Sequence, residues 1–208
     1  MTNETKQVKL HSRGSAKRLA RIALFTALMA VCAQISIPLP GGVPITLQTL
    51  AVMLASIALG FDGVAAVAVY VFLGLIGVPV FSKFGATASL VSPTGGYIVG
   101  FLPMSALMAT IIKTFEKRSE NSLKPAEKRG GARRYFLVFA IASLLGTIVC
   151  YTFGSAWFIG LFALKGAEKS IGYVLSVCVV PFILPDLLKI VLASYLGAVM
   201  CKTVRKNA

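Results

Sequence analysis

The chain has 208 residues, of which 57% are hydrophobic and only 13% are charged, and its mean hydropathy is +0.83. A soluble domain carries about 25% charged residues, so this composition excludes a soluble globular protein and indicates an integral membrane protein. The formal net charge of +14 could indicate a protein that binds nucleic acid, and the placement of the charges along the chain tests this possibility.

Apolar segments in chain order predict six helices in a single domain. A basic tail, residues 1–17, precedes the first segment, which we expect to be retained as a membrane span and not cleaved as a secretory signal. The first five predicted helices cover residues 18–37, 46–59, 63–78, 96–115 and 135–162, and residues 172–201 contain the sixth. Residues 18–201 then form a membrane substrate-binding domain, with a polar loop at 116–134 and a second basic tail at 202–208.

The second and third predicted helices are shorter than the ~20 residues that a membrane span requires. The loops 38–46 and 76–96 contain Pro, Gly and aromatic residues but only one charge, Lys83. Such loops can fold inward over a bundle, because irregular backbone is tolerated at membrane depth where protein buries it; plain tight turns are the alternative. The expected fold class is an all-α integral membrane protein with six transmembrane helices, whose outer loops cap a ligand pocket.

The basic residues predict the membrane topology. Six Lys or Arg precede residue 22, eight lie between Lys113 and Arg134, and three follow Met200. The other loops carry only Lys83, Lys165 and Lys169, so a cytoplasmic N-terminus gives 17 basic residues inside and three outside. This positive-inside bias predicts that both termini and the loop 116–134 are cytoplasmic in a bacterial or archaeal cell membrane. The charge then reflects orientation and contact with anionic membrane lipids, and no nucleic-acid partner is expected.

The sequence contains few groups suited to catalysis or metal binding. It has seven acidic residues, four cysteines without metal-ligand spacing and one histidine, His11, in the basic tail. We expect reduced thiols. Metal-dependent enzymes need several carboxylates or histidines together, and neither glycine pair continues as a phosphate-binding loop. We therefore expect no catalytic residue, no metal site, no cofactor and no enzymatic activity in this chain.

Asp186 and Lys189 are the only charged residues within the long apolar segments, and their spacing of three places them on one face of a helix. A charge at membrane depth costs about 2.5–3.5 kcal/mol. The pair therefore indicates a polar site for a small molecule with both donors and acceptors. A structural ion pair is the alternative. A membrane enzyme with Asp186 as its base lacks a visible second catalytic group, and a scaffold gives no reason for buried charges.

Four short motifs follow one another along the chain: PLPGGVPITLQTLAV at 38–52, GLIGVPVF at 74–81, SPTGGYIVGF at 92–101 and DLLK at 186–189. Together they resemble the BioY family, the biotin-specific substrate-binding component (S component) of energy-coupling-factor (ECF) transporters. The resemblance implies a six-helix protein that captures biotin from outside with high affinity. It also implies a transmembrane coupling subunit and two ATPase subunits as partners in uptake. Stand-alone uptake of biotin, and capture of another small vitamin, are the alternatives.

The resemblance assigns biotin contacts to Asp186 and Lys189. Their chemistry fits, because a carboxylate accepts from the two ureido N–H groups, and an ammonium donates to the ureido carbonyl or to the valerate carboxylate. The bicyclic ring needs apolar walls, and polar groups fix its orientation. The candidates for these roles are Phe81, Phe84, Tyr97 and Tyr151 as walls and Thr46 and Gln48, at the start of the second helix, as neutral polar groups.

These candidates have other possible roles. The aromatic residues also suit packing or anchoring at the membrane interface, and Gln48 suits an interhelical hydrogen bond. Lys83 is either a solvated loop charge or a partner for the substrate carboxylate, and the sequence leaves this choice open.

The first predicted helix carries small residues four apart, Ala23 and Ala27. Such a stripe lets another helix approach closely. The resemblance implies that it docks the coupling subunit, and ordinary packing within the bundle is the alternative.

Overall fold

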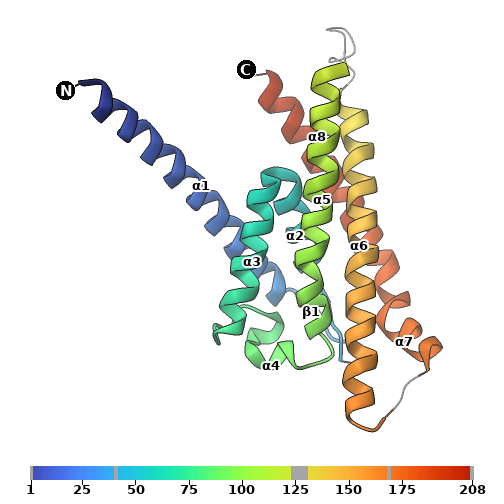
Figure 1. Cartoon of the computed structure of the whole chain (residues 1–208). Coiled ribbons are helices and arrows are strands. Elements are labelled where there is room, and N and C mark those ends of the chain that lie inside the picture. Colours follow the sequence, from blue (N-terminus) through green and yellow to red (C-terminus); the bar gives the residue numbers. More distant parts are fainter. Residues whose placement is uncertain (1, 40–41, 123–130, 168–169, 207–208) are drawn as a thin grey trace.

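The computed structural model describes the backbone of residues 2–39, 42–122, 131–167 and 170–206, and the side chains of residues 14–39, 42–83, 85–119, 132–167 and 170–201. Helices form nearly all of this part (Figure 1). They are α1 (Thr2–Gln34), α2 (Gln48–Leu59), α3 (Phe61–Leu75), the 3-10 turn η1 (Ser82–Phe84), α4 (Thr87–Leu90), α5 (Gly95–Ser122), α6 (Gly131–Leu164), α7 (Ile171–Cys178) and α8 (Val180–Lys206). Strands β1 (Ser36–Ile37) and β2 (Ile45–Thr46) pair antiparallel.

Three helical stretches in the described part are long and apolar enough to cross a membrane: Gly95–Ser119, Ala132–Leu164 and Ile171–Cys201. The outer faces of α6 and α8 expose large apolar side chains such as Ile141 and Leu188. Contiguous apolar surface of this kind is unusual on a soluble protein, and contact with lipid explains it. Together with α1, α2 and α3, these stretches confirm the predicted all-α membrane fold.

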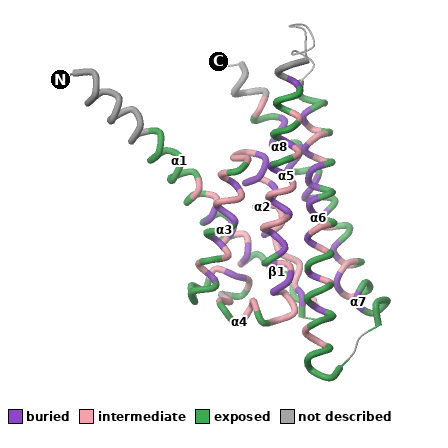
Figure 2. Tube along the Cα trace, in the orientation of Figure 1, coloured by how far each residue is buried: buried purple, intermediate pink, exposed green. Residues whose placement is uncertain are grey.

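The short helix α2 lies inside the bundle. It packs against α1, α3, α5 and α8, and Figure 2 shows it among the most buried parts of the chain. Because protein and not lipid surrounds α2, its 12 residues do not need to match the thickness of the bilayer. This arrangement explains why the second predicted segment is short.

A glycine pair makes the connection between α2 and α3 tight. Gly60 has φ +58°, a left-handed conformation that glycine adopts without a steric penalty. A Cβ at Gly63 would lie 2.3 Å from the carbonyl oxygen of Ala55, so only glycine lets the two backbones approach this closely. The sequence prediction leaves only residues 60–62 between the second and third helices, and the connection is shorter still because α3 already begins at Phe61.

The first predicted helix, residues 18–37, is wrong at both ends, because α1 already begins at Thr2, within the predicted tail 1–17. α1 stops at Gln34, and Ser36–Ile37 form β1. The residue before a proline avoids helical geometry, and here that proline is Pro38. Thr46, predicted to start the second helix, instead lies in β2 opposite Ser36. The resulting hairpin folds over the end of the bundle, which agrees with the prediction that loop 38–46 folds inward.

Two further helix boundaries differ from the sequence prediction. α5 continues to Ser122 and α6 already begins at Gly131, so most of the predicted polar loop 116–134 that the structure describes is helical. The charged residues in this stretch are good helix formers and extend the helices beyond the apolar core. Residues 123–130 lie outside the described part.

The segment 172–201, which is predicted to contain the last helix, forms two helices. α7 ends at Cys178, and Val179 (φ −126°, ψ −57°) separates it from α8. Pro181 explains the break, because a proline has no N–H to donate and clashes with the preceding turn, and it is tolerated only near a helix start. The break brings Phe182 and Asp186 toward the other helices at the end of the bundle that carries the loops.

The two ends of the bundle differ in charge. The α2–α3 turn, the end of α5 and the start of α6 lie together at one end, which we call the basic end (Figure 1). There Arg18 pairs with Asp62 at 2.7 Å and Lys113 lies 5.0 Å from the centre of the Phe61 ring. The helix α4, the two strands and the C-terminal end of α6 lie at the other end, which we call the loop end.

Candidate ligand-binding site

A cavity of about 260 Å³ lies inside the loop end of the bundle. Its size is close to the lower limit of about 300 Å³ for typical small-molecule pockets. The β1–β2 hairpin, α2, η1, α5, α6 and α8 all contribute to its wall, and most of that wall is apolar. Residues of the predicted loops 38–46 and 76–96 line it, as expected for loops that fold inward over a pocket.

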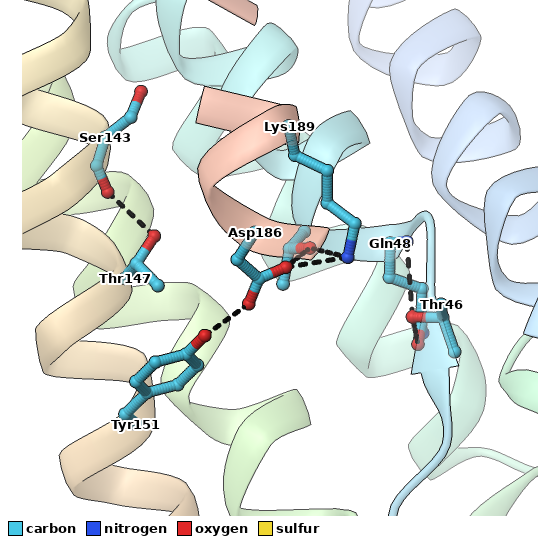
Figure 3. Close-up of polar contacts among 8 residues, drawn as sticks. Thr46, Gln48, Ser143, Thr147, Tyr151, Asp186 and Lys189 are labelled. Atoms are coloured by element: carbon cyan, nitrogen blue, oxygen red, sulfur yellow. Dashed lines mark hydrogen bonds and ion pairs between the residues drawn. The ribbon is translucent and has the colours of Figure 1, made fainter. Parts of the chain in front are cut away.

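Asp186 and Lys189 form the polar centre of this cavity. Lys189 Nζ donates to Asp186 Oδ1 at 2.7 Å, and the Tyr151 hydroxyl donates to Asp186 Oδ2 at 2.7 Å (Figure 3). The Thr49 hydroxyl donates to Asp186 Oδ1 at 3.2 Å and accepts from Lys189 Nζ at 3.0 Å. Three helices, α2, α6 and α8, therefore meet at one buried carboxylate.

Both members of this pair are buried. Asp186 is 3% exposed and Lys189 is 6% exposed. An ion pair in such a position is stable only if hydrogen bonds satisfy its remaining atoms, and Thr49 and Tyr151 provide them here. The four side chains together carry no net charge.

The centre has hydrogen-bonding capacity left for a ligand. A carboxylate offers about four acceptor positions, and Asp186 uses three of them. An ammonium has three donors, and Lys189 uses two of them on described residues. One acceptor position of Asp186, on Oδ2, and one N–H of Lys189 therefore remain at this centre, which suits a ligand that has both an N–H group and a carbonyl.

Gln48 and Thr46 have a partly structural role. The Thr46 hydroxyl donates to Gln48 Oε1 at 3.0 Å, and Gln48 Nε2 donates to the Tyr70 hydroxyl. Tyr70 in turn donates to the carbonyl of Val80 at 3.2 Å. Both residues line the cavity, but their polar groups connect the hairpin to α3 and to the loop before η1. This agrees with the alternative that Gln48 makes an interhelical hydrogen bond.

Aromatic rings form the apolar wall. Phe81 is 1% exposed and meets Tyr70 edge to face, with ring centres 5.3 Å apart. Tyr97 stacks on Phe182 at 6.3 Å and donates its hydroxyl to the carbonyl of Cys178 at 2.7 Å. That carbonyl is free of a helical partner because α7 ends there.

The structure gathers eight of the nine predicted ligand-binding residues around this one cavity: Thr46, Gln48, Phe81, Lys83, Tyr97, Tyr151, Asp186 and Lys189. The side chain of the ninth, Phe84, lies outside the described part. Lys83 is exposed to solvent and also lines the cavity.

Sequence reasoning missed several residues that line the cavity, among them Thr49 and Phe182. Thr49 lies in the motif at 38–52, directly after Gln48, and its side chain bridges the ion pair. Phe182 precedes Asp186 by four residues and therefore shares its helical face. Spacing from Asp186 was a usable signal for Phe182, whereas the position of Thr49 depends on how α2 packs against α8.

The two alanines predicted to dock a partner lie on the outer face of α1. Ala23 and Ala27 are both exposed, and Leu24 and Leu28 beside them are exposed as well. The stripe does not pack within this bundle, which removes the alternative of ordinary internal packing for these two residues.

Comparison with known proteins identifies the family of this chain. A family model described as the BioY family matches residues 2–206. The chain belongs to the BioY family. Among curated proteins it is 37% identical over 183 residues to the biotin transporter BioY of Thermotoga maritima, covering 87% of this chain and 94% of that one. It is 36% identical to the probable biotin transporter BioY of Pyrococcus horikoshii, covering 84% of this chain and 90% of that one.

A solved structure also matches nearly the whole chain. It is the crystal structure of the S-component for biotin from an ECF-type ABC transporter, with a TM-score of 0.73, 25% identity and coverage of 97% of this chain and 95% of that one. BioY membership and this match confirm the resemblance seen in the four sequence motifs. As a member of the BioY family with three helical stretches long and apolar enough to cross a membrane, the chain is a membrane protein.

Proposed function

We propose that this chain captures biotin with high affinity from outside the cell and serves as the substrate-specific subunit of an ECF-type ABC transporter. The observation that carries the proposal is the neutral centre of Asp186 and Lys189, completed by Tyr151 and Thr49, inside a mostly apolar cavity. The curated BioY relatives described as biotin transporters support the choice of substrate.

The ureido ring of biotin matches the capacity that the centre has left. A ureido N–H group can donate to the remaining acceptor position of Asp186, and the ureido carbonyl can accept the third N–H of Lys189. Charge-assisted bonds of this kind are roughly twice as strong as neutral ones. The aromatic walls then enclose the bicyclic ring, and Phe81, Tyr97 and Phe182 are well placed for that contact.

The orientation that we propose places the basic end and both chain termini in the cytoplasm. Exposed cations at that end include Arg18, Lys113 and Arg134, and the positive-inside bias favours this side for them. The loop end, with the cavity beneath its loops, then faces outward, as capture of an external vitamin requires.

We further propose that transport depends on partner proteins: a transmembrane coupling subunit and two ATPase subunits. This chain would bind the substrate without a cofactor of its own. The exposed Ala23 and Ala27 on α1 support a docking role, because small side chains leave room for a partner helix.

Native mass spectrometry of protein purified without added ligand tests the substrate. We expect biotin among the bound small molecules and one binding event per chain in calorimetry with added biotin. Absence of biotin from the purified protein together with absence of a binding signal would overturn the proposal. Co-expression with candidate coupling and ATPase subunits tests the partners, because ATP-driven uptake of biotin should appear only with the complete set.

A further inference from the structure

Lys83 lines the cavity in an unusual backbone conformation. Its φ is +56° and its ψ is +38°, and no other non-glycine residue in the described part of the chain has a positive φ. The left-handed region is unfavourable for a residue with a Cβ. Such residues persist only where the surrounding structure fixes them, and they are enriched at ligand sites.

Buried contacts fix the turn that carries Lys83. The backbone N–H of Phe81 donates to the carbonyl of Gly85 at 2.9 Å, which closes the turn on itself. The carbonyl of Phe81 accepts from Gln34 Nε2 on α1 at 3.0 Å. The ring of Phe81 fills the space above Gly74 on α3, where a Cβ would come within 2.1 Å of its ring atoms. Contacts of Phe81 with α1 and α3 therefore fix the position of Lys83 over the cavity.

The charges around the cavity leave Lys83 without a counter-charge. Among the described residues that line the cavity, only Lys83, Asp186 and Lys189 are charged. Lys189 already pairs with Asp186 at 2.7 Å, so these two cancel. The cavity as a whole therefore carries one excess positive charge, on a flexible four-carbon stem at the exposed side of the site.

We propose that Lys83 binds the carboxylate of the substrate's valerate chain and makes the site select an anionic ligand. This inference rests on the proposed function, and it assigns the two ends of biotin separately. The ureido ring lies at Asp186 and Lys189, and the carboxylate lies at the Lys83 turn. Of the two acceptor groups of the ligand, Lys189 then binds only the ureido carbonyl.

A comparison of two ligands on two proteins tests this assignment. Biotin and biotinamide, its neutral primary amide, are titrated calorimetrically into the purified wild-type chain and into Lys83→Met, which keeps the length of the side chain and removes the charge. We expect Lys83→Met to bind biotin about ten- to a hundredfold more weakly, as for loss of one hydrogen bond between charged groups. Biotinamide should bind both proteins equally well. Lys165→Met is the matched control, because Lys165 is an exposed lysine of the loop end that does not line the cavity, and it should change neither affinity.

The alternative outcomes are distinguishable. Unchanged biotin affinity in Lys83→Met would overturn the proposal. Equal weakening of biotin and biotinamide would also overturn it, because the lysine would then act only through the packing of its turn. If the wild-type chain binds neither ligand, the proposed function itself fails, and the assignment of Lys83 fails with it.

Discussion

Replacing Asp186 by Asn separates a ligand-binding role of the buried pair from a structural one. The substitution keeps the shape of the side chain but removes the charge that accepts from Lys189, Thr49 and Tyr151. For the ligand it replaces a charged acceptor by a neutral one. Loss of one such bond is worth ~1–3 kcal/mol, or about a ten- to hundredfold weaker affinity for biotin.

The same substitution also leaves Lys189 buried without its counter-charge, and breaking a buried pair in this way costs about 3–5 kcal/mol of stability. Affinity is therefore measured by calorimetry only on protein that is monodisperse, and thermal unfolding is recorded in parallel. The double variant Asp186→Asn/Lys189→Met removes both charges. We expect it to regain much of the lost stability but none of the lost affinity.

Two single variants bracket the effect. Tyr151→Phe removes one neutral donor to Asp186 Oδ2 and keeps the ion pair, so we expect at most about a tenfold loss of affinity. Asp62→Asn removes an acid at the basic end, far from the cavity, and should leave affinity unchanged. Wild-type affinity in folded Asp186→Asn would refute the binding role and assign the pair to helix packing.

Three other predictions concern the turn, the topology and the docking surface. Because Lys83 has φ +56°, Lys83→Gly should be about 1 kcal/mol more stable than Lys83→Ala in thermal unfolding, and equal stability would contradict a left-handed turn. In a background without the native cysteines, a membrane-impermeant thiol reagent should label Ala167→Cys in intact cells and Ser15→Cys only after permeabilisation; the reverse pattern would invert the orientation, since both positions are exposed. Ala27→Trp should keep biotin binding but lose co-purification with the coupling subunit and ATP-driven uptake, whereas full transport would show that this surface is not the docking face.

The sequence predicted the helices well because apolar length and charge placement act locally. The boundaries that it missed have different causes, and only some of them depend on contacts between distant segments. β1 forms only because Ser36–Ile37 meet Ile45–Thr46, and α5 continues past residue 115 because charged residues remain helical once the apolar part of the helix is fixed. The break at Val179 has a local cause, Pro181, which is visible in the sequence. The sequence alone does not show, however, whether this proline ends one helix or stands near the start of the next.

The candidate site illustrates the same limit at the level of single side chains. Motif membership selected Gln48 as a cavity residue, and it does line the cavity. Its amide, however, is engaged by Thr46 and by Tyr70, whose hydroxyl holds the carbonyl of Val80. Val80 directly precedes the closed turn that carries Lys83. A residue that looked like a ligand contact in the sequence is thus linked, through two hydrogen bonds, to the placement of the unpaired cation of the site. We therefore expect a substitution of Gln48 to change ligand binding through the Lys83 turn as much as through loss of direct contact. This connection becomes visible only from the packing of α2 against α3.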